Sequence, residues 1–184
     1  MNRDQGKLRG WCVVFGVLVA LTVCTEAMAS YRKTLRQHHR RGEFFNFDSM
    51  HSELVWDAVL LTPALREARV EREAALRHLG DDEAVGLPSE WYSTGTAFYL
   101  SVFIPKEAGD LKNGEWRLEL VDDQGRRHAP DSLSELPISG VDRRLFPFIT
   151  RWSKTYIVRF PAAVSPPLRL SLYGVLARST LQWR

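Results

Sequence analysis

The sequence predicts a mainly β protein, an antiparallel β-sandwich with one flanking α-helix, preceded by an N-terminal signal or anchor helix. Three observations carry this prediction. Residues 11–24 form an apolar block without charge, residues 63–79 carry a helix signal, and short stretches between residues 98 and 183 alternate apolar with polar side chains. Alternation with a period of two is typical of strands that bury one face, and several such strands at turn-marked intervals indicate a sandwich.

The apolar block has the flanks of a secretory signal. Arg3, Lys7 and Arg9 precede it, and Ala27-Met28-Ala29 follows it. This is the order of basic head, apolar middle and small residues at a cleavage site. The block is shorter than the roughly 20 helical residues that cross a hydrocarbon core. We therefore predict that residues 1–29 are a signal peptide or membrane anchor.

Three outcomes stay open for this segment. Cleavage after Ala29 follows the small-residue rule. Lipid attachment at Cys24 is the second outcome, because Leu21-Thr22-Val23-Cys24 resembles the bacterial lipoprotein box, although Val23 stands where a smaller residue is expected. The third outcome is an uncleaved single-pass anchor. We expect an exported protein that is periplasmic or membrane-associated, with the uncleaved anchor as the alternative.

A basic stretch without acids follows the apolar block. It contains Arg32, Lys33, Arg36, Arg40 and Arg41. We interpret residues 30–43 as a basic linker that touches anionic headgroups, where each basic residue contributes about 1 kcal/mol. In the alternative, this charge opposes translocation and keeps the following domain in the cytoplasm.

We predict that the remaining chain, residues 44–184, is a single domain. Its length and composition restrict the class of protein to which it can belong. It is long enough to bury about two thirds of its unfolded surface. Both cysteines, Cys12 and Cys24, lie in the apolar block, so the domain has no disulfide and no thiol nucleophile. Much of the basic excess lies in residues 32–41, whereas a nucleic-acid binder concentrates basic residues within its fold. We expect no nucleic-acid partner.

The first part of this domain carries a strand signal and a helix signal. Residues 53–61 favour a buried strand, with a helix as the alternative, because the apolar spacing fits both. Thr62-Pro63 gives a hydroxyl N-cap with proline at the first helical position, and Gly80 is a C-terminal stop. The apolar face of this helix holds Leu65, Ala68, Ala75, Leu76 and Leu79. The charged residues between Arg66 and Glu73 are interpreted as a solvated face.

The alternating stretches resemble a known architecture. They are Phe98–Ile104, then Trp116 to Leu120 with the turn residues Asp123-Gln124-Gly125, and then Trp152 to Phe160. Residues 96–183 resemble an immunoglobulin-like β-sandwich of the kind found in exported bacterial proteins and lipoproteins of unknown function. The cysteine pair of antibody domains is absent, and the helix at 63–79 is not standard. The resemblance implies a fold and an exported location, and it implies no catalytic residues.

Signals for chemistry are weak. The chain has no nucleophile elbow, no phosphate-binding loop and no zinc-protease helix motif. The five histidines are scattered or adjacent, and we predict no metal and no cofactor. Residues 122–125 carry aspartates that suit calcium, but Arg126 and Arg127 follow at once, so a hairpin turn is favoured. We therefore expect no enzyme activity.

One segment, residues 142–154, mixes cations with aromatic side chains around a proline. The candidate binding patch within it contains Arg143, Arg144, Phe146, Arg151 and Trp152. Arginine and aromatic residues dominate binding hot spots, and such a patch suits an acidic polymer or a lipid headgroup. In the favoured alternative the aromatic side chains fill the core while the arginines stay in water.

These observations favour a non-catalytic exported or membrane-anchored cell-envelope protein that acts as a binding or assembly module. Its partner would be another envelope protein or a membrane surface. One alternative is an envelope hydrolase with a dispersed active site. The other is a cytoplasm-facing membrane protein that binds anionic lipid through residues 32–41.

Overall fold

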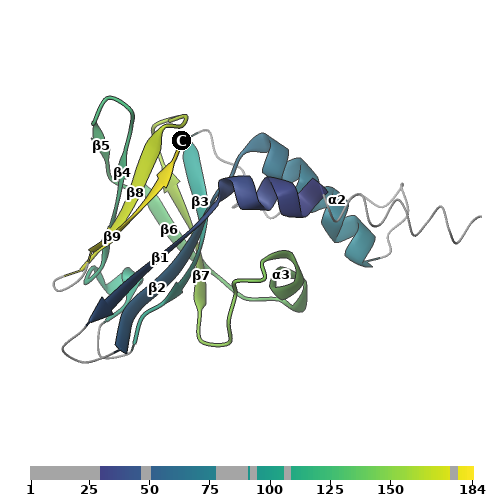
Figure 1. Cartoon of the computed structure of the whole chain (residues 1–184), viewed down its shortest axis with the longest axis horizontal. Helices are drawn as coiled ribbons and strands as arrows, with labels where there is room; N and C mark the ends of the chain where they lie inside the picture. Colours follow the sequence, from purple (N-terminus) through teal and green to yellow (C-terminus); the bar gives the residue numbers. More distant parts are fainter. Residues whose placement is uncertain (1–29, 47–50, 78–90, 92–94, 106–108, 175–177) are drawn as a thin grey trace, which may run out of the picture.

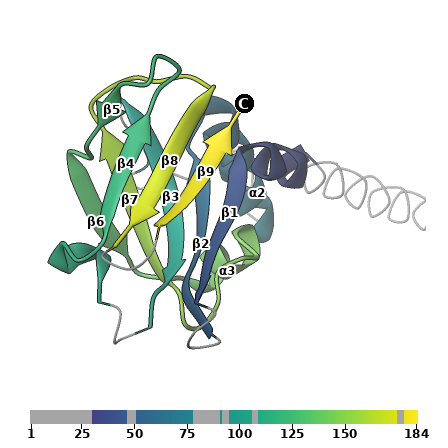
Figure 2. The ribbon, with the colours of Figure 1, turned by 60° about the vertical axis from the view of Figure 1, so that its left-hand side comes forward.

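Two antiparallel sheets make up most of the molecule. The computed structural model describes residues 30–46, 51–77, 91, 95–105, 109–174 and 178–184. Within these residues, one sheet has the strand order β1-β2-β3-β7-β6 and the other has the order β5-β4-β8-β9 (Figure 1). The four-stranded sheet lies in front of the five-stranded sheet in Figure 2. The prediction of a mainly β protein built as an antiparallel sandwich is confirmed.

The bounds of the elements follow the alternating stretches closely. The five-stranded sheet contains β1 (His39–Asn46), β2 (His51–Leu60), β3 (Thr96–Phe103), β7 (Lys154–Phe160) and β6 (Ser132–Leu136). The four-stranded sheet contains β5 (Arg127–His128), β4 (Arg117–Val121), β8 (Leu168–Tyr173) and β9 (Arg178–Trp183). The described helical elements are residues 30–38, α2 (Pro63–Arg77), the 3-10 turn η3 (Leu111–Asn113) and α3 (Gly140–Leu145). The strand interpretation of residues 53–61 is confirmed by β2, and the helix that begins at Pro63 by α2.

The larger core lies between the two sheets. Alternate residues of β2, β3 and β7 face alternate residues of β4, β8 and β9 across it. Its bulkiest fully buried members are aromatic, and three of them touch. The Phe98 ring centroid lies 6.0 Å from that of Phe160 in an edge-on arrangement and 5.1 Å from that of Trp183. Such aromatic pairs add roughly 1 kcal/mol each beyond their buried area.

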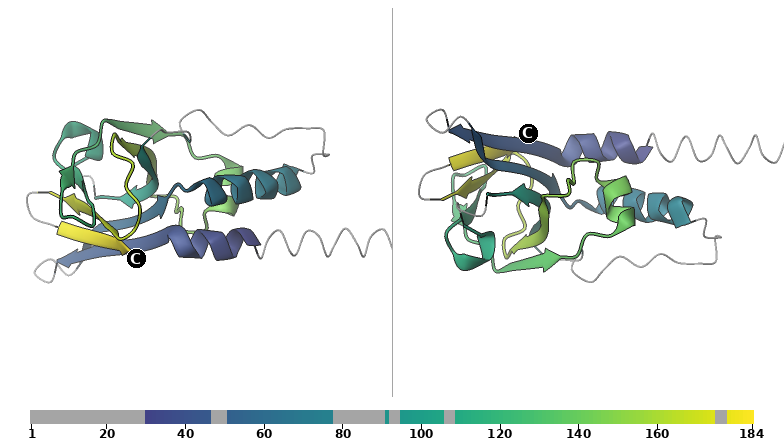
Figure 3. Two further views of the ribbon diagram at one scale, coloured as in Figure 1. Left: turned by 90° about the horizontal axis from the view of Figure 1, so that it is seen from above. Right: turned by 90° about the horizontal axis from the view of Figure 1, so that it is seen from below.

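The outer face of the five-stranded sheet is also covered. Tyr99 of β3, Val59 of β2 and Ile157 of β7 point away from the sandwich into a second core. Residues 30–38, α2 and α3 gather on one side of the sheets and close this core (Figures 1 and 3). Seven of the eight residues of β3 are therefore buried, on both faces of the strand. The protein has three layers: helices, five strands and four strands.

Residues 30–43, predicted to be a basic linker, belong to the fold, so that prediction is wrong. Residues 30–38 are helical, and β1 pairs with β2 along its whole length. Tyr31 and Leu35 lie one helical turn apart and are buried against the sheet, so the basic residues between them stay on the outside. At Gly42 the backbone passes so close to Trp56 that a Cβ would lie 2.4 Å from the indole Nε1.

The two sheets meet along β1 and β9, which lie side by side in Figure 2. Arg40 Nε donates a hydrogen bond to the Gln182 carbonyl at 2.8 Å. Trp183 Nε1 donates to the His38 carbonyl at 2.7 Å, and Trp56 Nε1 donates to Ser179 Oγ at 2.9 Å. The C-terminal end of the chain is thereby fixed beside residues 30–38.

The predicted signal or anchor, residues 1–29 with Cys24 and Ala29, lies outside the described residues. Within the described part of the chain, no helix has the length and apolar character needed to span a bilayer.

The burial of Leu35 gives a direct test of the helix at residues 30–38. Leu35→Ala removes a side chain that is only 6% exposed, and we expect the free energy of unfolding to fall by about 2–3 kcal/mol. Lys33→Ala, on the exposed side of the same helix, should change it by less than about 0.5 kcal/mol. Denaturant unfolding of the full chain in nonionic detergent, followed by tryptophan fluorescence, measures both. Equal midpoints for the two variants would mean that this helix is not packed.

Candidate functional site

A hollow of about 470 Å³ opens where the helical layer meets β1. We call it the basic hollow. Its rim carries Arg32, Arg36, Arg72 and Arg144. The remaining lining residues are Tyr31, Leu35, His39, Leu145, Pro147 and Phe148. The hollow therefore combines a strongly positive rim with a mainly apolar floor.

The four arginines of the rim come from three elements. Arg32 and Arg36 lie one turn apart on residues 30–38, so they point to the same side of that helix. Arg72 comes from α2 and Arg144 from α3. No ion pair or hydrogen bond joins any of these four to another described residue, and no acid lines the hollow. Its positive charge is uncompensated within the described part of the chain.

The floor of the hollow is held rigidly. The Tyr31 hydroxyl donates to the Leu145 carbonyl at 3.1 Å, and burial raises the pKa of Tyr31, which keeps this hydroxyl protonated. The rings of Phe148 and His39 are stacked, with centroids 4.6 Å apart and planes 3° apart. His39 Nε2 lies 2.8 Å from the buried carboxylate of Asp57 on β2. These contacts fix α3 and the following residues against residues 30–38 and β1.

A buried arginine joins the two helices that supply Arg72 and Arg144. Arg69 is 4% exposed, and its Nη2 lies 3.5 Å from Glu73 Oε2 on α2 and 3.4 Å from Asp142 Oδ1 on α3. Its guanidinium carbon lies 4.0 Å from the ring centroid of Trp91. The prediction that charged residues of α2 form a solvated face is therefore wrong for Arg69 and Glu73, because both belong to this buried ion-pair cluster.

Asp142 links the Arg69 cluster to the start of α3. Its backbone N–H donates to Ser139 Oγ at 3.1 Å, and its carboxylate accepts from the Ser139 backbone N–H at 2.9 Å, which forms a capping box. The same carboxylate accepts from Arg69. One residue therefore both begins α3 and holds it against α2. Arg144 follows two residues later and is positioned through it.

The patch predicted from residues 142–154 is divided between different environments. Arg144 lines the basic hollow, and Arg143 is exposed on the same helix. Phe146 is fully buried, with its ring centroid 4.5 Å from that of Tyr99. Trp152 is 65% exposed, and the Arg151 guanidinium carbon lies 4.5 Å from its ring centroid. The aromatic residues thus divide between core and solvent.

Sequence reasoning missed the basic hollow although all four of its arginines lie in stretches that the sequence singles out. Arg32 and Arg36 were interpreted as linker residues and Arg72 as part of a solvated helix face. The available signal was the pairing of Tyr31 with Leu35 at the same spacing as Arg32 with Arg36, which is typical of a helix with one apolar side.

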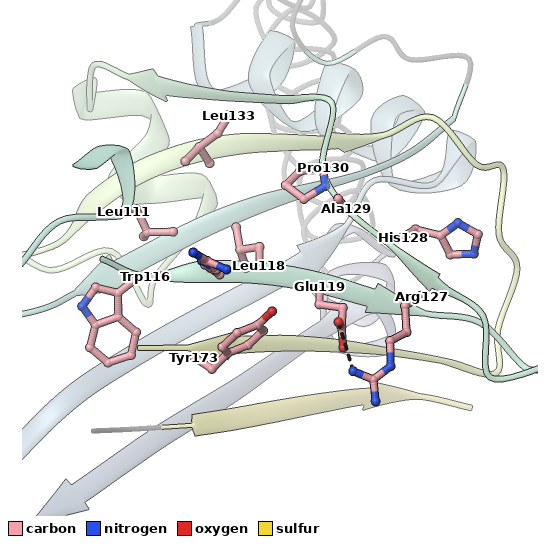
Figure 4. Close-up of a pocket in the computed structure, with 11 residues that line it drawn as sticks. Leu111, Trp116, Leu118, Glu119, Arg127, His128, Ala129, Pro130, Leu133 and Tyr173 are labelled. Atoms are coloured by element: carbon pink, nitrogen blue, oxygen red, sulfur yellow. Dashed lines mark hydrogen bonds and ion pairs between the residues drawn. The ribbon is translucent and has the colours of Figure 1, made fainter. Parts of the chain in front are cut away.

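A second hollow, of about 480 Å³, lies on the side of β4 that faces β5 and β6 (Figure 4). Trp116 and Tyr173 lie at one end of it, and Glu119 and Arg127 lie at the other. Arg127 Nη1 is 3.5 Å from Glu119 Oε2, so charges of opposite sign partly compensate here. The basic hollow is the stronger candidate because its charge has one sign.

The turn at residues 122–125 is a hairpin turn, as predicted. Asp122 Oδ1 accepts from the backbone N–H groups of Gln124 at 3.0 Å and Arg126 at 2.8 Å, and Gly125 has φ 78°. Asp122 Oδ2 accepts from Arg126 Nε at 2.7 Å and lies 3.1 Å from His128 Nε2. These donors occupy the carboxylate. Among the described residues, no group of three or more His, Cys, Asp or Glu side chains is placed to hold a metal ion.

Comparison with protein families, with curated proteins and with solved structures finds no match to this chain.

The ion pairs of Arg69 predict that two arginine variants differ in their free energy of unfolding. Arg69→Met leaves the carboxylate of Asp142 without its partner on α2, and we expect the free energy of unfolding to fall by about 3 kcal/mol. Arg143→Met, exposed on α3, should change it by less than about 0.5 kcal/mol. Urea unfolding of the full chain in nonionic detergent compares them. Similar stability of the two variants would contradict the bridging role of Arg69.

Asp122 predicts a pH dependence of stability. Burial by itself raises the pKa of Asp122, but the hydrogen bonds from His128 and Arg126 outweigh burial and hold the pKa well below its usual range. The carboxylate therefore stabilises the fold above its unfolded pKa of about 3.9, and this contribution is lost as the pH falls further. Asp122→Asn should be less stable than the wild type at pH 7, with a difference that shrinks toward pH 2. Urea midpoints across this range measure it, and a constant difference would exclude the assignment.

Proposed function

We propose that the chain is a non-catalytic cell-envelope protein, exported or membrane-anchored, that acts as a binding or assembly module. The basic hollow is the observation that carries this proposal. It places four arginines without ion-pair partners among the described residues around an apolar floor. Uncompensated charge held on a packed scaffold is a feature of binding surfaces, because it adds nothing to the stability of the free protein.

The helix that carries Arg32 and Arg36 begins soon after the predicted anchor, which supports a location of the basic hollow near the membrane. Residue 30, where the described helix begins, follows Cys24 by six positions. Six residues reach at most about 20 Å when fully extended. If lipid at Cys24 or an uncleaved apolar segment anchors the chain, the basic hollow is held close to the bilayer surface. Cleavage after Ala29 would release the same domain into the periplasm.

We also propose that the sandwich is of the immunoglobulin type. Lettered A to G in chain order from β2, with β5 as the additional strand C′, the sheets read A-B-E-D and C′-C-F-G. These are the orders of immunoglobulin sheets. β1 adds a further strand outside A. This architecture occurs in many cell-surface domains, which supports a binding role by analogy of fold only.

The alternatives differ in what they require. A cytoplasm-facing membrane protein would use the same arginines on the other side of the bilayer, so topology alone separates it from the leading proposal. An envelope hydrolase would require a nucleophile or an acid and base gathered in a cleft. The two hollows described above are lined mainly by arginines and apolar residues, together with one ion-paired glutamate, and each holds one histidine, His39 or His128. Each histidine lies against a buried aspartate.

The proposal predicts where the C-terminus resides. In the full chain, a reporter fused after Arg184 that is active only outside the cytoplasm should be active, and the protein should fractionate with the envelope. A reporter active only in the cytoplasm would overturn export. Mass analysis of the mature N-terminus separates cleavage after Ala29, lipid on Cys24 and an uncleaved chain. Cys24→Ser should abolish any lipid adduct, with Cys12→Ser as the matched control that retains it.

A further inference from the structure

We propose that the basic hollow binds the phosphate headgroup of an anionic membrane lipid, with Pro147 and Phe148 contacting the adjoining apolar part of the lipid. This inference rests on the proposed function for the position of the domain at the membrane. It adds the class of ligand and the residues that bind it. In particular, it assigns a role to Arg72 and Arg144, which lie far along the chain from the basic stretch at residues 32–41.

The charge of the hollow selects an anion. Two acids that contact residues of the hollow or lie on its elements already have cationic partners: Asp57 contacts His39 and Arg41, while Asp142 of α3 contacts Arg69. The four arginines of the rim are left without a carboxylate among the described residues. A guanidinium presents two parallel N–H groups that match the oxygens of a phosphate. Arginines on three separate elements can therefore surround one phosphate from several sides.

The floor of the hollow selects an amphiphile over a free phosphate. Tyr31, Leu35 and Leu145 are already buried beneath it, so the apolar surface open to a ligand comes from exposed Pro147 and half-buried Phe148. A volume of about 470 Å³ lies within the range of pockets that enclose small ligands and exceeds what an inorganic phosphate fills. An apolar group attached to the phosphate would remove the exposed surface of Pro147 and Phe148 from water, which contributes roughly 25 cal/mol per Å².

The scaffold distinguishes this site from a flexible basic tail. Arg32 and Arg36 are fixed by the burial of Tyr31 and Leu35, and Arg144 is positioned through Asp142 and Arg69. A flexible tail would respond only to the number of charges it carries. For a hollow with a fixed structure, the affinity for the ligand depends on which arginines are removed and not only on how many. This difference can be measured.

The test uses the full chain in nonionic detergent and three soluble probes: dihexanoyl phosphatidylglycerol, dihexanoyl phosphatidylcholine and glycerol 3-phosphate. Isothermal titration calorimetry measures the affinity for each probe. We expect the anionic lipid to bind at least tenfold more tightly than either of the others. The zwitterionic lipid lacks the net charge, and glycerol 3-phosphate lacks the apolar part. Equal binding of glycerol 3-phosphate would indicate a free-phosphate site, and equal binding of phosphatidylcholine would indicate apolar binding alone. Either result overturns the inference.

Two double variants with the same loss of charge separate the hollow from general electrostatics. R72Q/R144Q removes half of the rim and should weaken binding of the anionic lipid at least tenfold. R169Q/R178Q removes two exposed arginines of β8 and β9, on the four-stranded sheet, and should change it less than twofold. Equal losses in both would overturn the site. If R72Q/R144Q does not fold, Arg144→Glu alone, at an exposed position, must still weaken binding at least tenfold.

This experiment and the localisation experiment fail independently. A protein found in the envelope that does not prefer the anionic lipid would overturn the ligand assignment and leave the proposed function standing. A protein that prefers the anionic lipid but resides in the cytoplasm without a membrane would overturn the proposed function instead.

Discussion

The five-stranded sheet has to be covered on both faces, because β2, β3 and β7 carry large apolar side chains on each. One face packs on the four-stranded sheet across the core that holds Trp56 and Phe98. The other would expose Tyr99 and Ile157 if the helices did not cover it. Burying an aromatic side chain contributes roughly 2–3 kcal/mol, so this second face requires a third layer. The helices, the Arg69 cluster and the basic hollow all exist because of that requirement.

The sequence predicts those strands that bury one face or lie in the middle of a sheet. It does not predict most of the strands at the sheet edges. Alternation predicted β4, β7, β8 and β9, and it predicted the inner face of β3. It did not predict β1, where His39 to Glu43 shows no alternation. That strand is held by backbone pairing with β2 and by bonds such as Arg40 to Gln182, whose partners lie far away in the chain. The charge pattern of α2 predicts an exposed Arg69 for a similar reason. Its partner Asp142 lies 73 residues further along the chain, and the sequence around Arg69 does not reveal that contact.

The candidate site could be predicted from the sequence only in part, for the same reason. A window of sequence can identify a basic stretch or a mixture of arginine and aromatic residues, and both were identified. It cannot show that Arg36, Arg72 and Arg144 surround one hollow, because the three come from elements that only tertiary packing brings together. Nor can it separate Phe146 from Trp152, since burial of the first depends on Tyr99 and Trp91 in the second core.

The contact between β1 and β9 has a consequence for the order of folding. Trp183 contacts the carbonyl of His38, and Gln182 accepts from Arg40, so the seam between β1 and β9 can form only after β9 has been synthesised. Contacts between such distant residues slow folding. The contact between β1 and β9 therefore closes more than 130 residues after β1 itself has been synthesised. If the protein is exported, as proposed above, and crosses the membrane unfolded, late closure of this seam keeps the chain competent for transport.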